Sequence, residues 1–169
     1  MSKKAPKTEH IARMIGKTTF HDLKEGFAPG TFIGDSDADI KHALGLAQDN
    51  MGEAAVQALM TRFASTLAYE RPLRRAWAKE RREGAFASGA NRGRDGRQAA
   101  IIDRVASALA IRELAGAALS KTEIEEWAWL LFTSQPTMTQ AVRDCREWLD
   151  DMVRDAKDAF LGALGEEAA

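Results

Sequence analysis

The feature that most constrains the fold is a heptad pattern near the C-terminal end of the sequence. Apolar or small residues recur there with alternating spacings of four and three, over nearly four heptads. They are Met138, Val142, Cys145, Leu149, Met152, Ala156, Ala159 and Ala163. This seam predicts a long helix at about 137–164. Trp148 and Phe160 flank the seam and widen it, which is typical of a helix that docks on a bundle.

The rest of the chain shows helical spacing as well, and the two-residue alternation of a strand persists nowhere. Further helices are expected from Thr8, from a cap at Asp35 or Ser36 to about 50–52, around 56–67, over 72–83 and over about 97–119. Another should start after Ser120, because Ser120 and Glu123 have the spacing of a capping box. The sequence therefore predicts an all-α fold, a compact bundle of about six helices.

The chain of 169 residues suits one domain, and its 45% hydrophobic residues are enough for a core. We expect a flexible basic tail at 1–7 and a single helical domain over 8–169. The longest apolar run, 127–132, is far too short to cross a bilayer, and no apolar segment follows the basic N-terminus. A single cysteine, Cys145, excludes a disulfide framework. These features favour a cytoplasmic protein without a membrane partner.

Sequence motifs for catalysis or metal binding are incomplete. The residues at 16–19 resemble the end of a phosphate-binding loop, but Ile11 occupies the position of the required first glycine. The acidic residues at 35–39 resemble a calcium loop, but Ile40 and Leu46 replace its glycine and glutamate. Cys145 lies on the apolar seam, where a thiol is expected to be a core residue. We therefore expect a protein that is not an enzyme and has no cofactor or metal.

Charge is distributed very unevenly along the chain. Residues 71–97 contain nine basic and three acidic side chains, whereas residues 98–169 contain seven basic and thirteen acidic ones. Such asymmetry points to partners or to self-association. The basic residues of the middle segment are Arg71, Arg74, Arg75, Lys79, Arg81, Arg82, Arg92, Arg94 and Arg97.

Four of these arginines share one face of the helix expected at 72–83. At 100° per residue, a face about 120° wide contains Arg74, Arg75, Arg81 and Arg82. The helix and the glycine-rich loop after it are expected to project from the bundle. The loop residues Arg92, Arg94 and Arg97 would form a flexible second contact.

The tryptophans have different expected roles. Trp77 lies on an apolar edge beside the arginine face, where it would either anchor the helix or stack on a partner. Trp127 and Trp129 point about 200° apart on a helix, so one of them should lie near the surface or in an interface.

Two functional hypotheses follow from the segregated arginines. In the first, the protein is a non-enzymatic subunit of a nucleoprotein assembly that contacts the phosphates of DNA or RNA without reading sequence. In the second, it is an adaptor or inhibitor that uses the same arginines against an acidic protein. That acidic surface includes the C-terminal part of a second copy of this chain.

Overall fold

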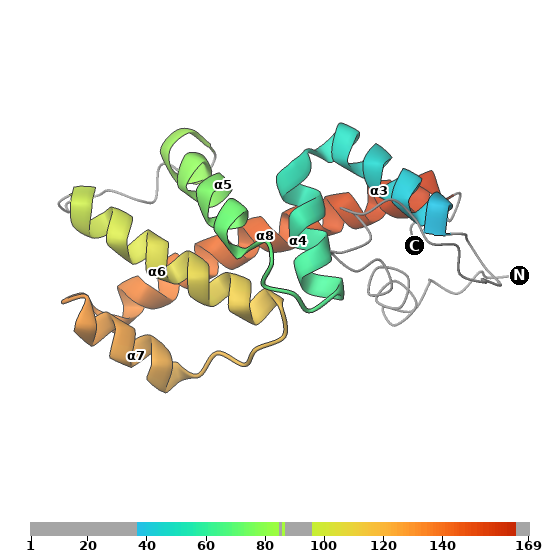
Figure 1. Ribbon diagram of the computed structural model, residues 1–169. Helices are drawn as coiled ribbons and strands as arrows, with labels where there is room; N and C mark the ends of the chain where they lie inside the picture. Colours follow the sequence, from blue (N-terminus) through green and yellow to red (C-terminus); the bar gives the residue numbers. More distant parts are fainter. Residues whose placement is uncertain (1–36, 85, 87–95, 165–169) are drawn as a thin grey trace, which may run out of the picture. The chain divides into compact units, whose positions relative to one another are not determined.

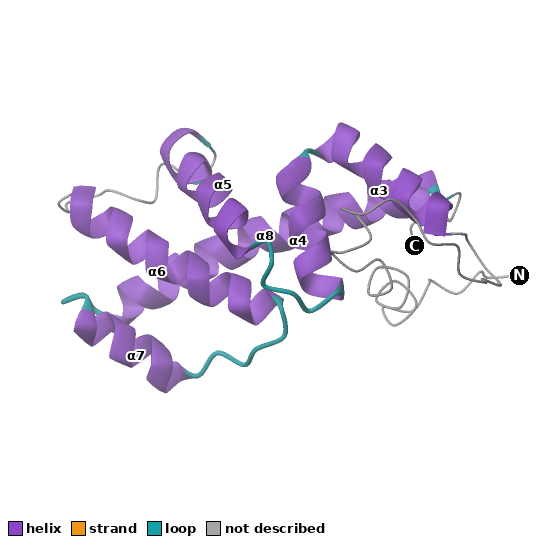
Figure 2. Ribbon diagram, viewed as in Figure 1, coloured by secondary structure: helices purple, strands orange, loops and turns teal. Residues whose placement is uncertain are grey.

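The computed structural model describes residues 37–84, 86 and 96–164 (Figure 1). Within these ranges the chain forms helices joined by short connections and contains no strand (Figure 2). The prediction of an all-α fold is therefore confirmed. The predicted tail at 1–7 and the helix expected from Thr8 lie outside the described residues. The helices are α3 (Asp37–Met51), α4 (Glu53–Phe63), α5 (Glu70–Glu83), α6 (Gly96–Leu114), α7 (Lys121–Leu130) and α8 (Gln135–Ala163).

The described helices belong to two compact units (Figure 1). In the first unit α3 packs against α4, and the part of α8 from Asp151 onward belongs with them. The second unit runs from Tyr69 to Asp150 and contains α5, α6, α7 and the first part of α8. The single helical domain expected over 8–169 stays a prediction.

The heptad seam forms most of the buried face of α8, as the spacing predicts. Its buried members are Met138, Val142, Cys145, Leu149 and Ala156. Met152 and Ala159 are half-buried, and Ala163 is exposed in the last turn. Pro136 is the second residue of α8, where its missing N–H costs no helical hydrogen bond. The helix therefore begins slightly before the expected residue 137.

Two helices end earlier than their apolar patterns suggest. The helix expected to reach Leu67 stops at Phe63, and Leu67 is 47% exposed. Just beyond that end, Ser65 has a positive φ of 49°, which no helical residue adopts. α6 stops at Leu114 rather than near 119, because Gly116 with φ of 101° turns the chain away from the helix axis.

α5 docks on the core of the second unit. Leu73 and Trp77 lie one turn apart on one side of the helix and are almost completely buried, and α5 packs against α6 (Figure 1). The helix begins at Glu70, so Pro72 occupies its first turn, where a proline is tolerated. α5 does not stand clear of the bundle, and only its outer side faces solvent.

Within the described ranges, no helix combines the length and the apolar character needed to cross a bilayer.

Candidate functional site

The outer side of α5 carries a line of four exposed cations. Arg71, Arg75, Lys79 and Arg82 stand at positions i, i+4, i+8 and i+11, and all four are exposed. At 100° per residue they fall within about 80° of one another, and the line is about 16 Å long. Leu73 and Trp77 point to the opposite side, so the docking of α5 orients this line toward solvent. We call these four residues the cation stripe.

None of the four stripe residues forms an ion pair with any described residue. Glu83, one turn beyond Lys79, is exposed and also makes no ion pair with it. Exposed cations on α7 and α8 behave differently, since each has a carboxylate within 3.6 Å. Those paired cations are Lys121, Arg143, Arg146 and Arg154. Arg62 on α4 and Arg104 on α6 are also exposed without an ion pair to a described residue, but each stands alone. The feature of α5 is therefore the line of four such cations along one side of the helix.

Two of the four arginines expected on one open face are engaged within the protein. Arg74 is partly buried and pairs with Glu70, with 3.1 Å between Nη1 and Oε1. The side chain of Arg81 is only 9% exposed. The expectation that Arg81 belongs to a solvent-facing contact surface is wrong, because Arg81 lies one turn from Trp77 and follows it into the core. Arg75 and Arg82 remain exposed, as expected.

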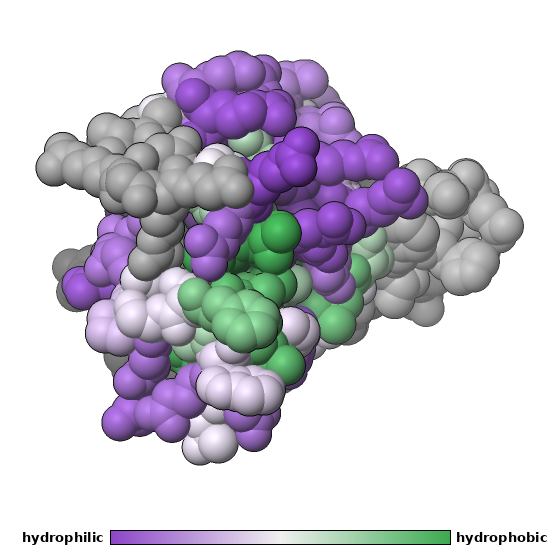
Figure 3. Space-filling model, turned by 90° about the vertical axis from the view of Figure 1, so that its left-hand side faces the viewer, coloured by the Kyte–Doolittle hydropathy of each residue, from purple (hydrophilic) through white to green (hydrophobic). Residues whose placement is uncertain are grey.

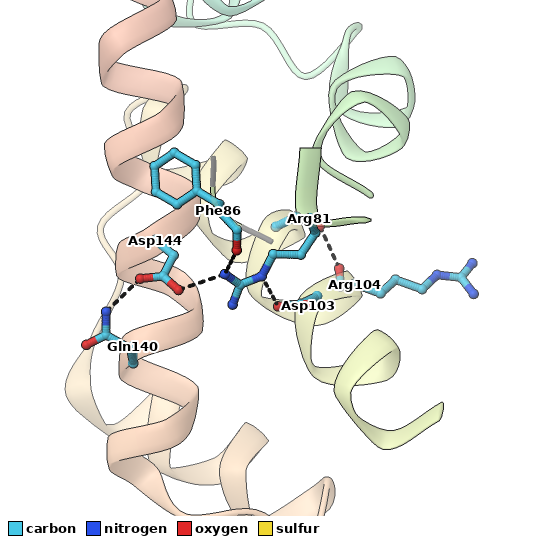
Figure 4. Close-up of polar contacts among 7 residues, drawn as sticks. Arg81, Phe86, Asp103, Arg104, Gln140 and Asp144 are labelled. Carbon is cyan, nitrogen blue, oxygen red and sulfur yellow. Dashed lines mark hydrogen bonds and ion pairs between the residues drawn. The ribbon is translucent and has the colours of Figure 1, made fainter. Parts of the chain in front are cut away.

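Arg81 is the centre of a buried ion cluster that joins three helices (Figure 4). Its Nε lies 3.2 Å from Asp103 Oδ1 on α6, and its Nη1 lies 3.0 Å from Asp144 Oδ2 on α8. The same Nη1 donates to the backbone carbonyl of Phe86 at 3.0 Å. Burial raises the pKa of Asp103 above its ordinary value, Arg81 lowers it, and Asp144 raises it further. The cluster ties the end of α5 to α6, to α8 and to the backbone of Phe86.

Trp77 is an anchor of α5. Its ring centroid lies 5.6 Å from that of Phe86 and 5.3 Å from that of Trp148, and the Arg81 guanidinium sits 5.2 Å from it. The residue is 1% exposed. A ring enclosed in this way has no face open to a base, so the expectation of stacking on a partner is wrong and that of anchoring is confirmed.

The other predicted contact residues are only partly placed by the structure. Arg92 and Arg94 lie outside the described residues. Arg97 is exposed in the first turn of α6. The sequence signal for the cation stripe is the spacing of its members, at i, i+4, i+8 and i+11. The face predicted from Arg74 missed it because that face includes Arg81, which is buried.

The described residues offer little for other chemistry. In these parts of the chain, no group of three or more His, Cys, Asp and Glu side chains is arranged to hold a metal ion. Cys145 is completely buried, and burial raises the pKa of its thiol, so the thiolate needed of a nucleophile is disfavoured.

Comparison with protein-family models, curated proteins and solved structures finds no match to this chain.

Proposed function

We propose that this protein is a non-enzymatic helical subunit of a nucleoprotein assembly, in which the cation stripe contacts the phosphate backbone of DNA or RNA. The observation that carries the proposal is a line of four exposed cations with no ion pair among the described residues. Phosphates are the anions that occur in regular linear arrays, and Arg and Lys are the side chains that neutralise them.

The energetics of α5 support a ligand for the stripe. Like charges one turn apart repel, by about 0.2–0.5 kcal/mol for each pair. Arg82 gains from its place in the last turn, where the helix dipole favours cations, but Arg71 and Arg75 lie too far from that end to benefit. Neither the helix dipole nor an ion pair with a described residue stabilises the two N-terminal members, and an anionic partner would offset their repulsion.

The proposed contact reads the backbone rather than the bases. The outer side of α5 presents no exposed aromatic residue, since Trp77 is enclosed in the core. Phosphate contacts alone position a protein on nucleic acid without conveying sequence. We therefore expect similar affinities for unrelated sequences of the same strand type.

The test is to replace all four stripe residues with glutamine, which keeps helix propensity and removes the charge. The fourfold variant (Arg71→Gln, Arg75→Gln, Lys79→Gln, Arg82→Gln) should weaken binding to a short duplex equally for different sequences. Log affinity against log salt should become flatter by about 3.6, which corresponds to four lost phosphate contacts. Fluorescence anisotropy across a salt series measures both quantities.

The matched control removes the same charge from elsewhere. The variant Lys121→Gln, Arg143→Gln, Arg146→Gln, Arg154→Gln lowers the net charge equally, but it removes cations that are paired with carboxylates. This control should retain most of the wild-type slope of log affinity against log salt, which we call the salt slope. If the two variants lose the same slope, binding depends on overall charge and the stripe is not the site.

A further inference from the structure

A cluster of exposed apolar side chains lies where the end of α7 meets the start of α6. Phe132 is 92% exposed, Trp129 77%, Leu130 53% and Ile101 51%. Figure 3 shows apolar side chains gathered on this end of the molecule, next to a strongly hydrophilic region. We call these four residues the apolar cluster. It lies within the second unit and shares no residue with the cation stripe.

The cluster is held in place by hydrogen bonds. The Phe132 N–H donates to the Trp129 carbonyl and the Thr133 N–H donates to the Ala128 carbonyl, which is the pattern that closes a helix C-terminus. The Gln98 side chain on α6 donates to the carbonyls of Leu131 and Phe132, at 3.3 Å each. Ile101 stands one turn after Gln98, so it lies on the same side of α6 as this turn. The exposed side chains therefore belong to an ordered surface.

Phe132 occupies a position where the backbone favours glycine. Its φ is 50°, in the left-handed region that bulky residues rarely adopt. A glycine at this position would adopt the same φ without strain and would expose no apolar side chain. The chain instead has an aromatic ring there, almost fully exposed to solvent. Strain of this kind concentrates at functional positions.

Opposite charges accompany the cluster on the two helices. Arg104 is one turn after Ile101 on α6, and Glu126 is one turn before Trp129 on α7. Both are exposed, and neither forms an ion pair with a described residue. In Figure 4 the Arg104 side chain points away from the Arg81 ion cluster. The surface therefore carries its own complementary charges.

We propose that a second copy of this chain covers the apolar cluster in a two-fold dimer, in which Arg104 of each copy faces Glu126 of the other. A two-fold interface uses the same patch on both copies, so it requires a self-complementary surface. The cluster is flanked by one exposed charge of each sign, so a two-fold axis through it can set each Arg104 against Glu126 of the other copy. The pairing is independent of the proposed contact with nucleic acid.

The size of the cluster predicts a weak dimer. Phe132 and Trp129 expose roughly 300 Å² per copy, by the areas typical of aromatic side chains. Stable dimers bury about 800 Å² on each partner, so the cluster needs its polar rim to reach even the lower end of that range. We expect a dissociation constant of about 1–100 μM.

Sedimentation velocity on nuclease-treated protein, from about 1 to about 200 μM, tests the dimer. The sedimentation coefficient of the wild type should rise with concentration. Trp129→Ser combined with Phe132→Ser should weaken association at least about tenfold without touching the core. Phe132→Gly alone should weaken association and raise Tm by about 2–4 °C, because it removes the contact and relieves the backbone.

Charge reversal tests the register of the dimer. Arg104→Glu alone places two carboxylates opposite each other, and Glu126→Arg alone places two cations there, so each should weaken association about tenfold. An equimolar mixture of these two variants should recover wild-type association, because every facing pair is again opposite in charge. Wild-type protein that stays monomeric to about 200 μM overturns the proposal. Association unaffected by Trp129→Ser and Phe132→Ser, or not recovered in the mixture, also overturns it.

Discussion

Arg81→Gln is expected to lower the free energy of unfolding by about 3 kcal/mol at neutral pH, because it leaves two buried carboxylates without their cation. The side chains of Asp103 and Asp144 are only 16% and 14% exposed. Without Arg81 the two carboxylates repel each other at a site that is largely shielded from water. Urea unfolding followed by circular dichroism measures the loss.

The same variant should depend on pH in a defined direction. The pKa of Asp103 is already raised in the folded protein, and Arg81 is the group that lowers it. Without Arg81 the folded state binds a proton still more tightly than the unfolded state does. Stability then falls as pH rises from the ordinary pKa of an aspartate through the raised one. The loss relative to the wild type should therefore be smaller at about pH 5 than at about pH 7.5.

A triple variant separates burial of charge from loss of packing. Arg81→Gln with Asp103→Asn and Asp144→Asn removes all three charges, and it should recover much of the lost stability. It should also lack the fall in stability with rising pH that Arg81→Gln shows, because neither carboxyl remains to titrate. A loss below about 1 kcal/mol for Arg81→Gln would mean that the cluster behaves as a surface ion pair.

Trp77→Ala is expected to cost about 3–5 kcal/mol of stability, the range for removing a large buried aromatic side chain. Trp77 packs against Phe86 and Trp148 and is almost completely buried, so its loss leaves a cavity beneath α5. Thermal unfolding followed by circular dichroism measures the effect. Trp77→Phe fills most of the cavity and should cost much less.

Binding measured below the melting temperature of Trp77→Ala distinguishes an anchor from a stacking residue. An anchor leaves the cation stripe intact, so the salt slope should equal that of the wild type. A folded Trp77→Ala variant that loses affinity with its stability unchanged would contradict the enclosed position of the ring.

Much of the fold follows from apolar spacing, because helix packing depends on local periodicity. The seam from Met138 to Leu149 and the pair Leu73 and Trp77 are buried as their spacing predicts. The N-cap of α7 is also readable from sequence, since Ser120 accepts a hydrogen bond from the Glu123 N–H at 3.1 Å. These features involve residues only a few turns apart.

The ion cluster around Arg81 could not be predicted from the spacing of residues along one helix. Asp103 and Asp144 lie 22 and 63 positions further along the chain, on two other helices. Only tertiary packing brings them to Arg81. The face of arginines drawn from 100° per residue therefore includes Arg81, although its side chain is buried in an ion cluster. Once Leu73 and Trp77 are known to be buried, the opposite side of α5 must face solvent. The cations on that side are the four residues of the cation stripe.

The exposure of Phe132 could likewise not be predicted from the periodicity of apolar residues. The apolar run at 127–132 covers more than one side of a helix, so the spacing alone does not tell which of its members face solvent. Trp129 is the exposed tryptophan of its pair and Trp127 is half-buried, as their angular separation requires. The end of α7 at Leu130 then places Phe132 outside the helix.

The most direct test of the proposed function is a titration of wild-type protein with short labelled nucleic acids from about 50 to about 200 mM salt. Two duplexes of unrelated sequence and one single-stranded RNA suffice, with fluorescence anisotropy as the measurement. The proposal predicts equal affinities for the two duplexes. It also predicts slopes of log affinity against log salt near −3.6 for duplex and about −2.8 for single strands, from four phosphate contacts. Absence of salt-sensitive binding at the lowest salt would contradict the proposal and assign the cation stripe to an acidic protein surface.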